Sequence, residues 1–288
     1  MKEIVLNFFW GLGVKILHTG KRLGISGPFE HFIDISASEI FRVPQNEQRV
    51  IIPGGLKMIV PPNFPRSRTY ASGSYEPEVT TLFEKIVKQG MNVIDVGAFC
   101  GYYSLITSRL VGSSGKIFSF EADPLNYKYL VNNLSINGCT NTQAVNQAIS
   151  NKKGTMSIDV KESADHKRLL PTSKADAAII ETTTLDDYFK SVNWPTIDLI
   201  KMDIEGAEQM ALEGMIWLSK KNPNLRIIME YDLNNLSFFE ADEKSLDSTL
   251  LKLGFKTAFM IEQRMKAYQL SSGLPKTKAT YNLLVTKN

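Results

Sequence analysis

The chain has 288 residues, of which 43% are hydrophobic and 22% charged, so it can fold around a sizeable core. Its formal net charge of +3 is too small to indicate a nucleic-acid partner, and none is expected. Its two cysteines, Cys100 and Cys139, exclude a disulfide framework and make a reduced, cytoplasmic setting the expectation.

Residues 4–17 are rich in apolar side chains, but Asn7 and Lys15 interrupt them. The run is shorter than the ~20 apolar residues that a membrane-spanning helix needs, and no signal-peptide cleavage site follows it. We favour a helix that packs on the main domain or on a second copy of the chain, which leaves a homo-oligomer open. The alternative is peripheral membrane contact through residues 1–22, with Trp10 at the headgroup boundary.

Residues 1–75 are expected to form an N-terminal appendage of one helix and short strands, which contacts substrate, membrane or another subunit. Alternating runs predict strands near residues 39–43, 49–52 and 57–60, and the turn residues Pro53-Gly54-Gly55 predict a hairpin between the last two. Three prolines at positions 61, 62 and 65 then indicate a linker.

Residues 76–288 are expected to form the main domain, in which strands alternate with helices. This alternation predicts an α/β fold with a mostly parallel sheet covered on both faces. Strands are expected at 92–96, 116–120, 142–146, 155–160, 198–202, 225–230, 255–261 and 281–285, and helices at 78–88, 101–110, 124–136, 207–218 and 244–253. The last two strands have no helix between them and should pair antiparallel. Residues 161–178 lack a clear period and are interpreted either as a flap near the site or as a plain surface loop.

The run Asp95-Val96-Gly97-Ala98 ends the strand at 92–96, and Gly101 opens the next helix. This spacing suits a cofactor whose adenosine and amino-acid tail approach bare backbone at a helix N-terminus, with Asp95 near the ammonium of the tail. It departs from the glycine spacing that dinucleotides need. A tight strand-to-helix turn without a ligand is the alternative.

Two further strand ends add to this cofactor interpretation. Glu121 ends the next strand, where a carboxylate can hold ribose hydroxyls. Gln147 follows the third strand, where an amide can meet the adenine edge, although a surface turn is an equal alternative.

Acidic residues follow two later strands. Asp203 emerges from the strand at 198–202 and should face the same crevice as Gly97, because ligands bind outside the carboxyl ends of such strands. Glu205 and Glu230 are further catalytic candidates, although Glu205 and Glu208 also suit the first turn of a helix. With Asp203 they could supply a general base for a hydroxyl, or oxygen ligands for a divalent cation.

At these residues the chain resembles the FkbM family of S-adenosylmethionine-dependent methyltransferases. The matching motifs lie between residues 73 and 230: Gly73-Ser74-Tyr75-Glu76-Pro77-Glu78, Asp95-Val96-Gly97-Ala98, Gly101-Tyr102-Tyr103-Ser104, Phe120-Glu121-Ala122-Asp123-Pro124, Asn133, Thr184-Leu185-Asp186-Asp187, and Lys201-Met202-Asp203-Ile204-Glu205-Gly206-Ala207-Glu208. The sequence departs from the usual family pattern at Phe99 and Ala122.

The resemblance implies a Rossmann-like class I fold with seven strands, and methylation of a hydroxyl on a sugar, glycan, glycolipid or related natural product. It places S-adenosylmethionine against Asp95, Gly97, Ala98, Gly101, Tyr102, Glu121, Ala122, Gln147 and Asp203. Asp203 would lie next to the reacting methyl group.

Two other classes compete with this interpretation. A nicotinamide-dependent oxidoreductase shares the strand-glycine-helix layout but needs glycines that are absent here. A non-catalytic interaction module would use the first helix as its surface. A nucleic-acid N-methylating enzyme is disfavoured, because Asp203-Ile204-Glu205-Gly206 stands where an Asn/Asp-Pro-Pro-aromatic run is expected.

Overall fold

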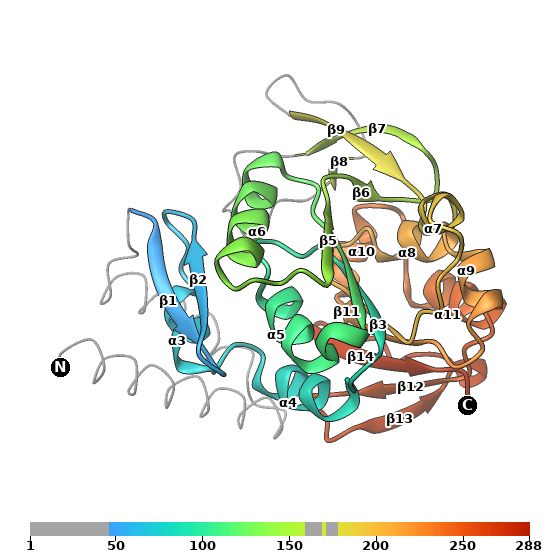
Figure 1. Cartoon of the computed structure of the whole chain (residues 1–288). Coiled ribbons are helices and arrows are strands. Elements are labelled where there is room, and N and C mark those ends of the chain that lie inside the picture. Colours follow the sequence, from blue (N-terminus) through green and yellow to red (C-terminus); the bar gives the residue numbers. More distant parts are fainter. Residues whose placement is uncertain (1–45, 159–168, 171–177) are drawn as a thin grey trace.

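The computed structural model describes residues 46–158, 169–170 and 178–288 (Figure 1). The predicted N-terminal helix, the predicted strand near residues 39–43 and most of the predicted flap lie outside these residues. No helix in the described ranges is long and apolar enough to cross a membrane.

An eight-stranded sheet forms the centre of the molecule, in the order β13-β12-β14-β11-β10-β3-β4-β5. Five neighbouring strands run parallel: β3 (Asn92–Val96), β4 (Lys116–Phe120), β5 (Thr142–Val145), β10 (Leu199–Met202) and β11 (Arg226–Tyr231). Antiparallel pairs add β12 (Thr257–Met260), β13 (Lys266–Gln269) and β14 (Tyr281–Thr286). The mostly parallel sheet and the antiparallel final pair are confirmed. The expected count of seven strands is one too few, because β13 extends the edge beyond β12.

Helices cover both faces of this sheet, as predicted (Figure 1). On β3, Val93 and Ile94 are both fully buried, but they belong to different hydrophobic clusters on opposite faces. The Val93 face packs against α4 (Pro77–Ile86), α5 (Tyr102–Val111) and α6 (Pro124–Ile136). The Ile94 face packs against α7 (Leu185–Ser191), α8 (Glu208–Glu213), α9 (Ile216–Lys221) and α11 (Glu243–Lys252).

Two predictions within the main domain are wrong in detail. The strand expected at 155–160 is β7 (Gly154–Ile158), and it lies outside the central sheet in a four-stranded sheet with β6 (Ala148–Ile149), β8 (Leu169–Leu170) and β9 (Ala178–Thr183). The helix expected at 207–218 is broken between α8 and α9. Gly214 lies at the break, where a Cβ atom would approach the carbonyl oxygen of Ser150 to 2.3 Å.

Several short elements connect these layers, and the sequence pattern did not predict them. The proline-rich linker contains α3 (Ser67–Ser72). The remaining elements are α10 (Leu233–Ser237), η1 (Gly112–Ser114) and η2 (Leu270–Ser272).

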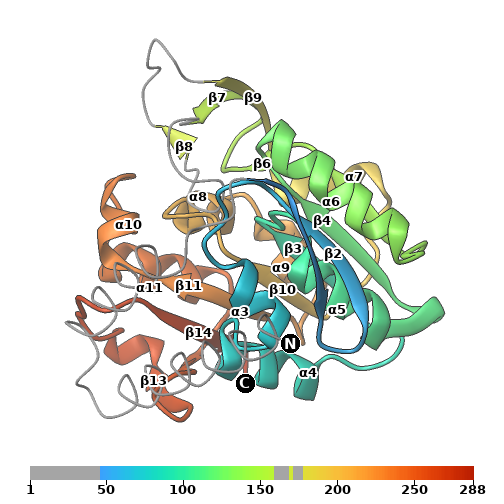
Figure 2. The ribbon, with the colours of Figure 1, turned by 90° about the vertical axis from the view of Figure 1, so that its left-hand side faces the viewer.

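The predicted hairpin consists of β1 (Gln48–Ile52) and β2 (Leu56–Val60), joined by the expected turn. It lies beside α6 (Figure 2). Asn133 of α6 binds both backbone groups of Ile59, accepting from its N–H at 2.7 Å and donating to its carbonyl at 2.8 Å. One helical turn later, Asn137 binds both backbone groups of Lys57 in the same way. The two side-chain amides therefore satisfy the backbone groups of β2 as a neighbouring strand would. The boundary at residue 75 stays a prediction.

Replacing Asn133 by alanine is expected to lower the free energy of unfolding by about 3 kcal/mol, because buried groups lose their partners. The Asn133 amide is fully buried and also donates to the Cys100 carbonyl at 2.8 Å. Urea unfolding measures the loss. The more exposed Asn137→Ala variant is the control, and a loss there as large as at Asn133 would contradict this explanation.

Candidate active site

The turn from β3 to α5 lies at the centre of the sheet. The strands β4 and β5 lie on one side of β3, and β10 and β11 lie on the other, so the strand order reverses between β3 and β10. Open α/β sheets bind ligands at such a switch point, outside the carboxyl ends of the strands. The predicted cofactor turn and Asp203 both follow strands that end here.

Gly97 brings this turn against the end of β10. Its φ is +81°, and a Cβ atom at this position would lie 1.9 Å from the carbonyl oxygen of Asp203. The Asp203 N–H also donates to the Val96 carbonyl at 3.0 Å, which is a second contact between the ends of β10 and β3. The structure therefore brings together Gly97 and Asp203, as the sequence predicted, and only glycine fits the approach.

Two backbone amides of the same turn already donate hydrogen bonds within the protein. The N–H groups of Gly97 and Ala98 both donate to the Phe120 carbonyl, at 3.0 and 2.9 Å. Gly101 follows at φ +98° and begins α5. These bonds fix the shape of the turn before any ligand arrives, so a cofactor would meet a rigid surface.

Glu121 follows β4 directly and fixes the turn through its carboxylate. Its Oε2 accepts from the Phe99 N–H at 2.8 Å and its Oε1 from the Asp123 N–H at 2.9 Å. Phe99 has φ +50°, an uncommon conformation for a residue with a side chain, and this bond holds it there. A carboxylate at the carboxyl end of this strand is the kind of group that accepts hydrogen bonds from ribose hydroxyls.

The other predicted cofactor contacts lie around this turn. Tyr102 packs in an aromatic cluster, with its ring stacked on Tyr70 at 4.7 Å between centroids. The carbonyl of the half-buried Ala122 accepts from the Asn146 side chain at 3.1 Å. Gln147 donates to Glu181 at 3.1 Å. Contact of any of these with a cofactor stays a prediction.

Asp95 lies beneath the turn and is only 3% exposed. Burial raises its pKa to about 6, although a hydrogen bond from Ser104 and the charge of Lys201 oppose the rise. The Ser104 hydroxyl donates to it at 2.5 Å and also contacts Ser119 at 2.7 Å. In the structure Asp95 is thus a buried acceptor for the Ser104 hydroxyl. Its contact with the ammonium of a cofactor stays a prediction.

Lys201 is the central cation of the site, and the sequence-based candidates did not include it. Its side chain is 1% exposed on β10, in register with Asp95 on β3. Its Nζ lies 3.2 Å from Asp203 Oδ2 and 5.1 Å from the centre of the Tyr103 ring. Burial alone would lower the pKa of Lys201, but the charges of Asp203, Glu76 and Asp95 raise it above its usual value. Lys201 therefore stays charged and orients Asp203.

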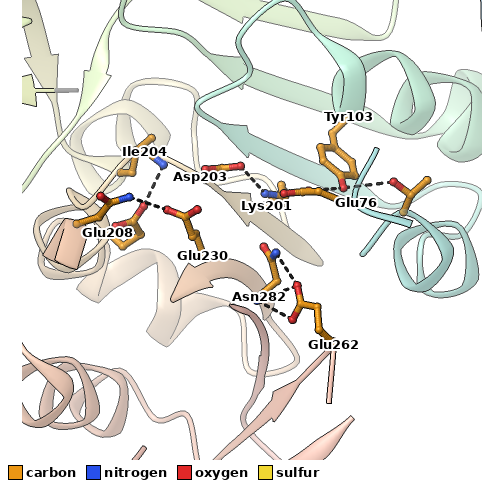
Figure 3. A network of polar contacts seen from close by, with 11 residues as sticks. Glu76, Tyr103, Lys201, Asp203, Ile204, Glu208, Glu230, Glu262 and Asn282 are labelled. Atoms are coloured by element: carbon orange, nitrogen blue, oxygen red, sulfur yellow. Dashed lines mark hydrogen bonds and ion pairs between the residues drawn. The ribbon is translucent and has the colours of Figure 1, made fainter. Parts of the chain in front are cut away.

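Of the other two catalytic candidates, Glu205 and Glu230, the second lies beside this pair in Figure 3. Asn235 connects them, donating to Glu205 at 3.1 Å and to Glu230 at 3.3 Å. Burial, with the charges of Asp203 and Glu205, raises the pKa of Glu230 well above its usual value. Burial likewise raises the pKa of Glu208 to about 7, and this side chain accepts from the Ile204 N–H at 3.0 Å. Glu208 thus lies in the first turn of α8, as the alternative interpretation expected, and its carboxyl group also holds the segment between β10 and α8.

The predicted divalent-cation site is not supported. Among the described residues, no three His, Cys, Asp or Glu side chains form a group that could hold a metal ion. The physical reason is that Lys201 pairs with Asp203, while the Asn235 amide occupies the position between Glu205 and Glu230.

Three further polar residues near Lys201 come from distant parts of the chain. Glu76 precedes α4, while Glu262 and Asn282 are joined by hydrogen bonds of 2.9 to 3.1 Å at the β14 side of the site. Asn282 is the cross-strand partner of Glu230. A lysine within an otherwise apolar strand was a usable sequence signal for Lys201. The sequence held no comparable signal for Glu262 or Asn282.

The fold and its switch point define a Rossmann-like α/β protein with a ligand site at the carboxyl ends of β3 and β10. Residues 95–257 match the model of the methyltransferase FkbM domain. The match covers more than half of the chain, which therefore belongs to the FkbM methyltransferase family. The match decides for a methyltransferase over a nicotinamide-dependent oxidoreductase or a non-catalytic module.

Individual relatives are more distant. The ribosomal RNA large subunit methyltransferase E of Buchnera aphidicola subsp. Cinara cedri is 48% identical over 44 residues, which are 15% of this chain and 21% of that protein, so the chain spans about a fifth of this relative. A SAM dependent methyltransferase from Aquifex aeolicus aligns over 73% of this chain and 89% of its own, with 15% identity and a TM-score of 0.42. Aeropyrum pernix fibrillarin aligns over 73% and 74%, with 11% identity and a TM-score of 0.42. These structural likenesses are too weak to carry an argument about substrate.

Proposed function

We propose that this chain transfers a methyl group from S-adenosylmethionine to a hydroxyl of a sugar, glycan, glycolipid or related natural product. The observation that carries the proposal is the contact between the Gly97 turn and the end of β10. It puts a carboxylate, Asp203, next to the turn where the methionine end of the cofactor would lie. A cytoplasmic setting, peripheral membrane contact and a homo-oligomer stay predictions.

The described residues fit the cofactor. Glu121 lies at the carboxyl end of β4, where its carboxylate would meet the ribose hydroxyls, and Gly97 holds the neighbouring turn against the end of β10. Ala98 and Gly101 would border the methionine end, and Gln147 the adenine. When bound, S-adenosylmethionine supplies an electrophilic methyl group on a sulfonium.

The chain itself has two chemical tasks in methyl transfer: it must orient the acceptor hydroxyl and receive its proton. Asp203 suits the second task, because its side chain is 25% exposed and one of its oxygens is held by Lys201. Its other oxygen can then receive the proton. The surrounding carboxyl groups all carry oxygens that can accept hydrogen bonds, which suits an acceptor molecule that is rich in hydroxyl donors.

An acceptor screen tests the proposal. The protein and S-adenosylmethionine are incubated with neutral methyl glycosides, glycolipids, phenols and RNA, and S-adenosylhomocysteine is measured. Release that depends on glycosides or glycolipids supports the proposal. Release only with phenols or RNA contradicts the proposed acceptor class.

Replacing Glu121 by alanine is expected to weaken binding of S-adenosylmethionine by about tenfold to a hundredfold, because the hydrogen bonds to the ribose are lost. Calorimetric titration gives the dissociation constant, and circular dichroism shows whether the fold is retained. The exposed Glu84→Ala variant should bind as the wild type does. Unchanged affinity of the Glu121→Ala variant would contradict the assignment of Glu121 to the ribose hydroxyls.

A further inference from the structure

Glu76 has a strained backbone. It precedes α4 with φ +39° and ψ +59°, in the left-handed region that residues with a Cβ atom rarely adopt. Pro77 follows it, and the ring of a proline further disfavours helical conformations in the residue before it. Such strain persists where the surroundings impose it, and it gathers at functional sites.

The side chain of Glu76 is held in one orientation. Its Oε2 accepts from the Tyr103 hydroxyl at 2.7 Å, and Thr80 lies 3.3 Å from the same hydroxyl. Burial, together with the charge of Glu76, raises the pKa of Tyr103 well above its usual value, so the hydroxyl remains a donor. Glu76 is half-buried, and within the described residues no donor bonds its Oε1.

This orientation brings Glu76 to the site from outside residues 95–257, the segment that matches the family model. Figure 3 shows the side chain between Tyr103 and Lys201, with Asp203 on the other side of Lys201. The charge of Glu76 also contributes to the raised pKa of Lys201 and, in part, to that of Glu262. The Lys201 ion pair itself is with Asp203. Two carboxylates from distant parts of the chain therefore lie near one buried ammonium.

We propose that Glu76 is an acceptor-binding residue, whose second carboxylate oxygen receives a hydrogen bond from a hydroxyl adjacent to the one that is methylated. The inference rests on the proposed function and narrows its acceptor to a molecule with neighbouring hydroxyls, as on a sugar ring. On this proposal the strained backbone of Glu76 persists because it places the carboxylate on the opposite side of Lys201 from Asp203, which receives the proton.

The test replaces Glu76 by glycine, which tolerates positive φ, and by glutamine, which keeps the shape without the charge. Glu240→Gly is the matched control, because Glu240 is an exposed acid at φ +57°. The assays are thermal unfolding, calorimetric binding of S-adenosylmethionine, and S-adenosylhomocysteine release with a panel of neutral methyl glycosides.

The proposal predicts that Glu76→Gly still folds and binds S-adenosylmethionine within about twofold, while its KM for the glycoside rises at least about tenfold. Glu76→Gln should show a smaller rise in KM, and Glu240→Gly none. Unchanged glycoside kinetics in Glu76→Gly would overturn this inference alone. Lost cofactor binding in Glu76→Gly would instead make Glu76 a structural residue. A wild type that releases no S-adenosylhomocysteine with any glycoside would overturn the proposed function and this inference together.

Discussion

Replacing Asp203 by asparagine is expected to lower turnover by about 10²- to 10⁴-fold, the usual contribution of a general base, while S-adenosylmethionine still binds. Asparagine keeps the shape and can still accept from Lys201, 3.2 Å away in the wild type. It cannot receive a proton from the acceptor hydroxyl. Single-turnover formation of the methylated product measures the effect, with calorimetry for the cofactor.

The matched control is Asp198→Asn, just before the amino end of β10. Asp198 accepts from the Asn92 N–H at 2.8 Å, at the edge of the sheet opposite to the site. This variant should turn over as the wild type does. Full activity in Asp203→Asn would exclude Asp203 as the base, and loss of cofactor binding would make it a binding residue.

Replacing Lys201 by methionine is expected to lower the free energy of unfolding by about 3 kcal/mol, because removing one partner of a buried ion pair leaves the other uncompensated. The lysine is 1% exposed, whereas the Asp203 side chain is 25% exposed and partly hydrated, which puts the loss at the low end of the usual range. Urea unfolding at neutral pH measures it.

Two comparisons isolate the ion pair from the packing of the lysine chain. Lys256→Met removes an exposed lysine and should change stability by less than about 0.5 kcal/mol. The double variant Lys201→Met with Asp203→Asn should lose less than the sum of the two single variants. Strict additivity would mean that the 3.2 Å pair contributes nothing to stability.

Much of the fold could be predicted because the strands carry their own signals. The strands β3, β4 and β10 are rich in apolar residues and are followed directly by Gly97, Glu121 and Asp203. Their parallel arrangement follows from the helices between them. Parallel strands end at one edge of the sheet, so the contact of Gly97 with Asp203 was predictable from local pattern and topology.

The other features depend on contacts between distant residues. The break before α9 follows from Gly214 packing on Ser150, and the edge strand β13 follows from its pairing with β12. Glu262 lies just after β12 and reaches the site because it binds Asn282 of the neighbouring strand β14. Nothing in the local sequence around these residues reports such contacts, whereas a lysine at position 201 within an apolar strand does report a buried partner.

Calorimetric titration of the wild-type protein with S-adenosylhomocysteine and, separately, with NADH tests the central claim most directly. The assignment of Glu121, Gly97 and Asp203 to one cofactor site predicts saturable binding of S-adenosylhomocysteine at a single site and no heat of binding with NADH. Binding of NADH, or of neither compound, would contradict the claim that this crevice holds an adenosyl methyl donor.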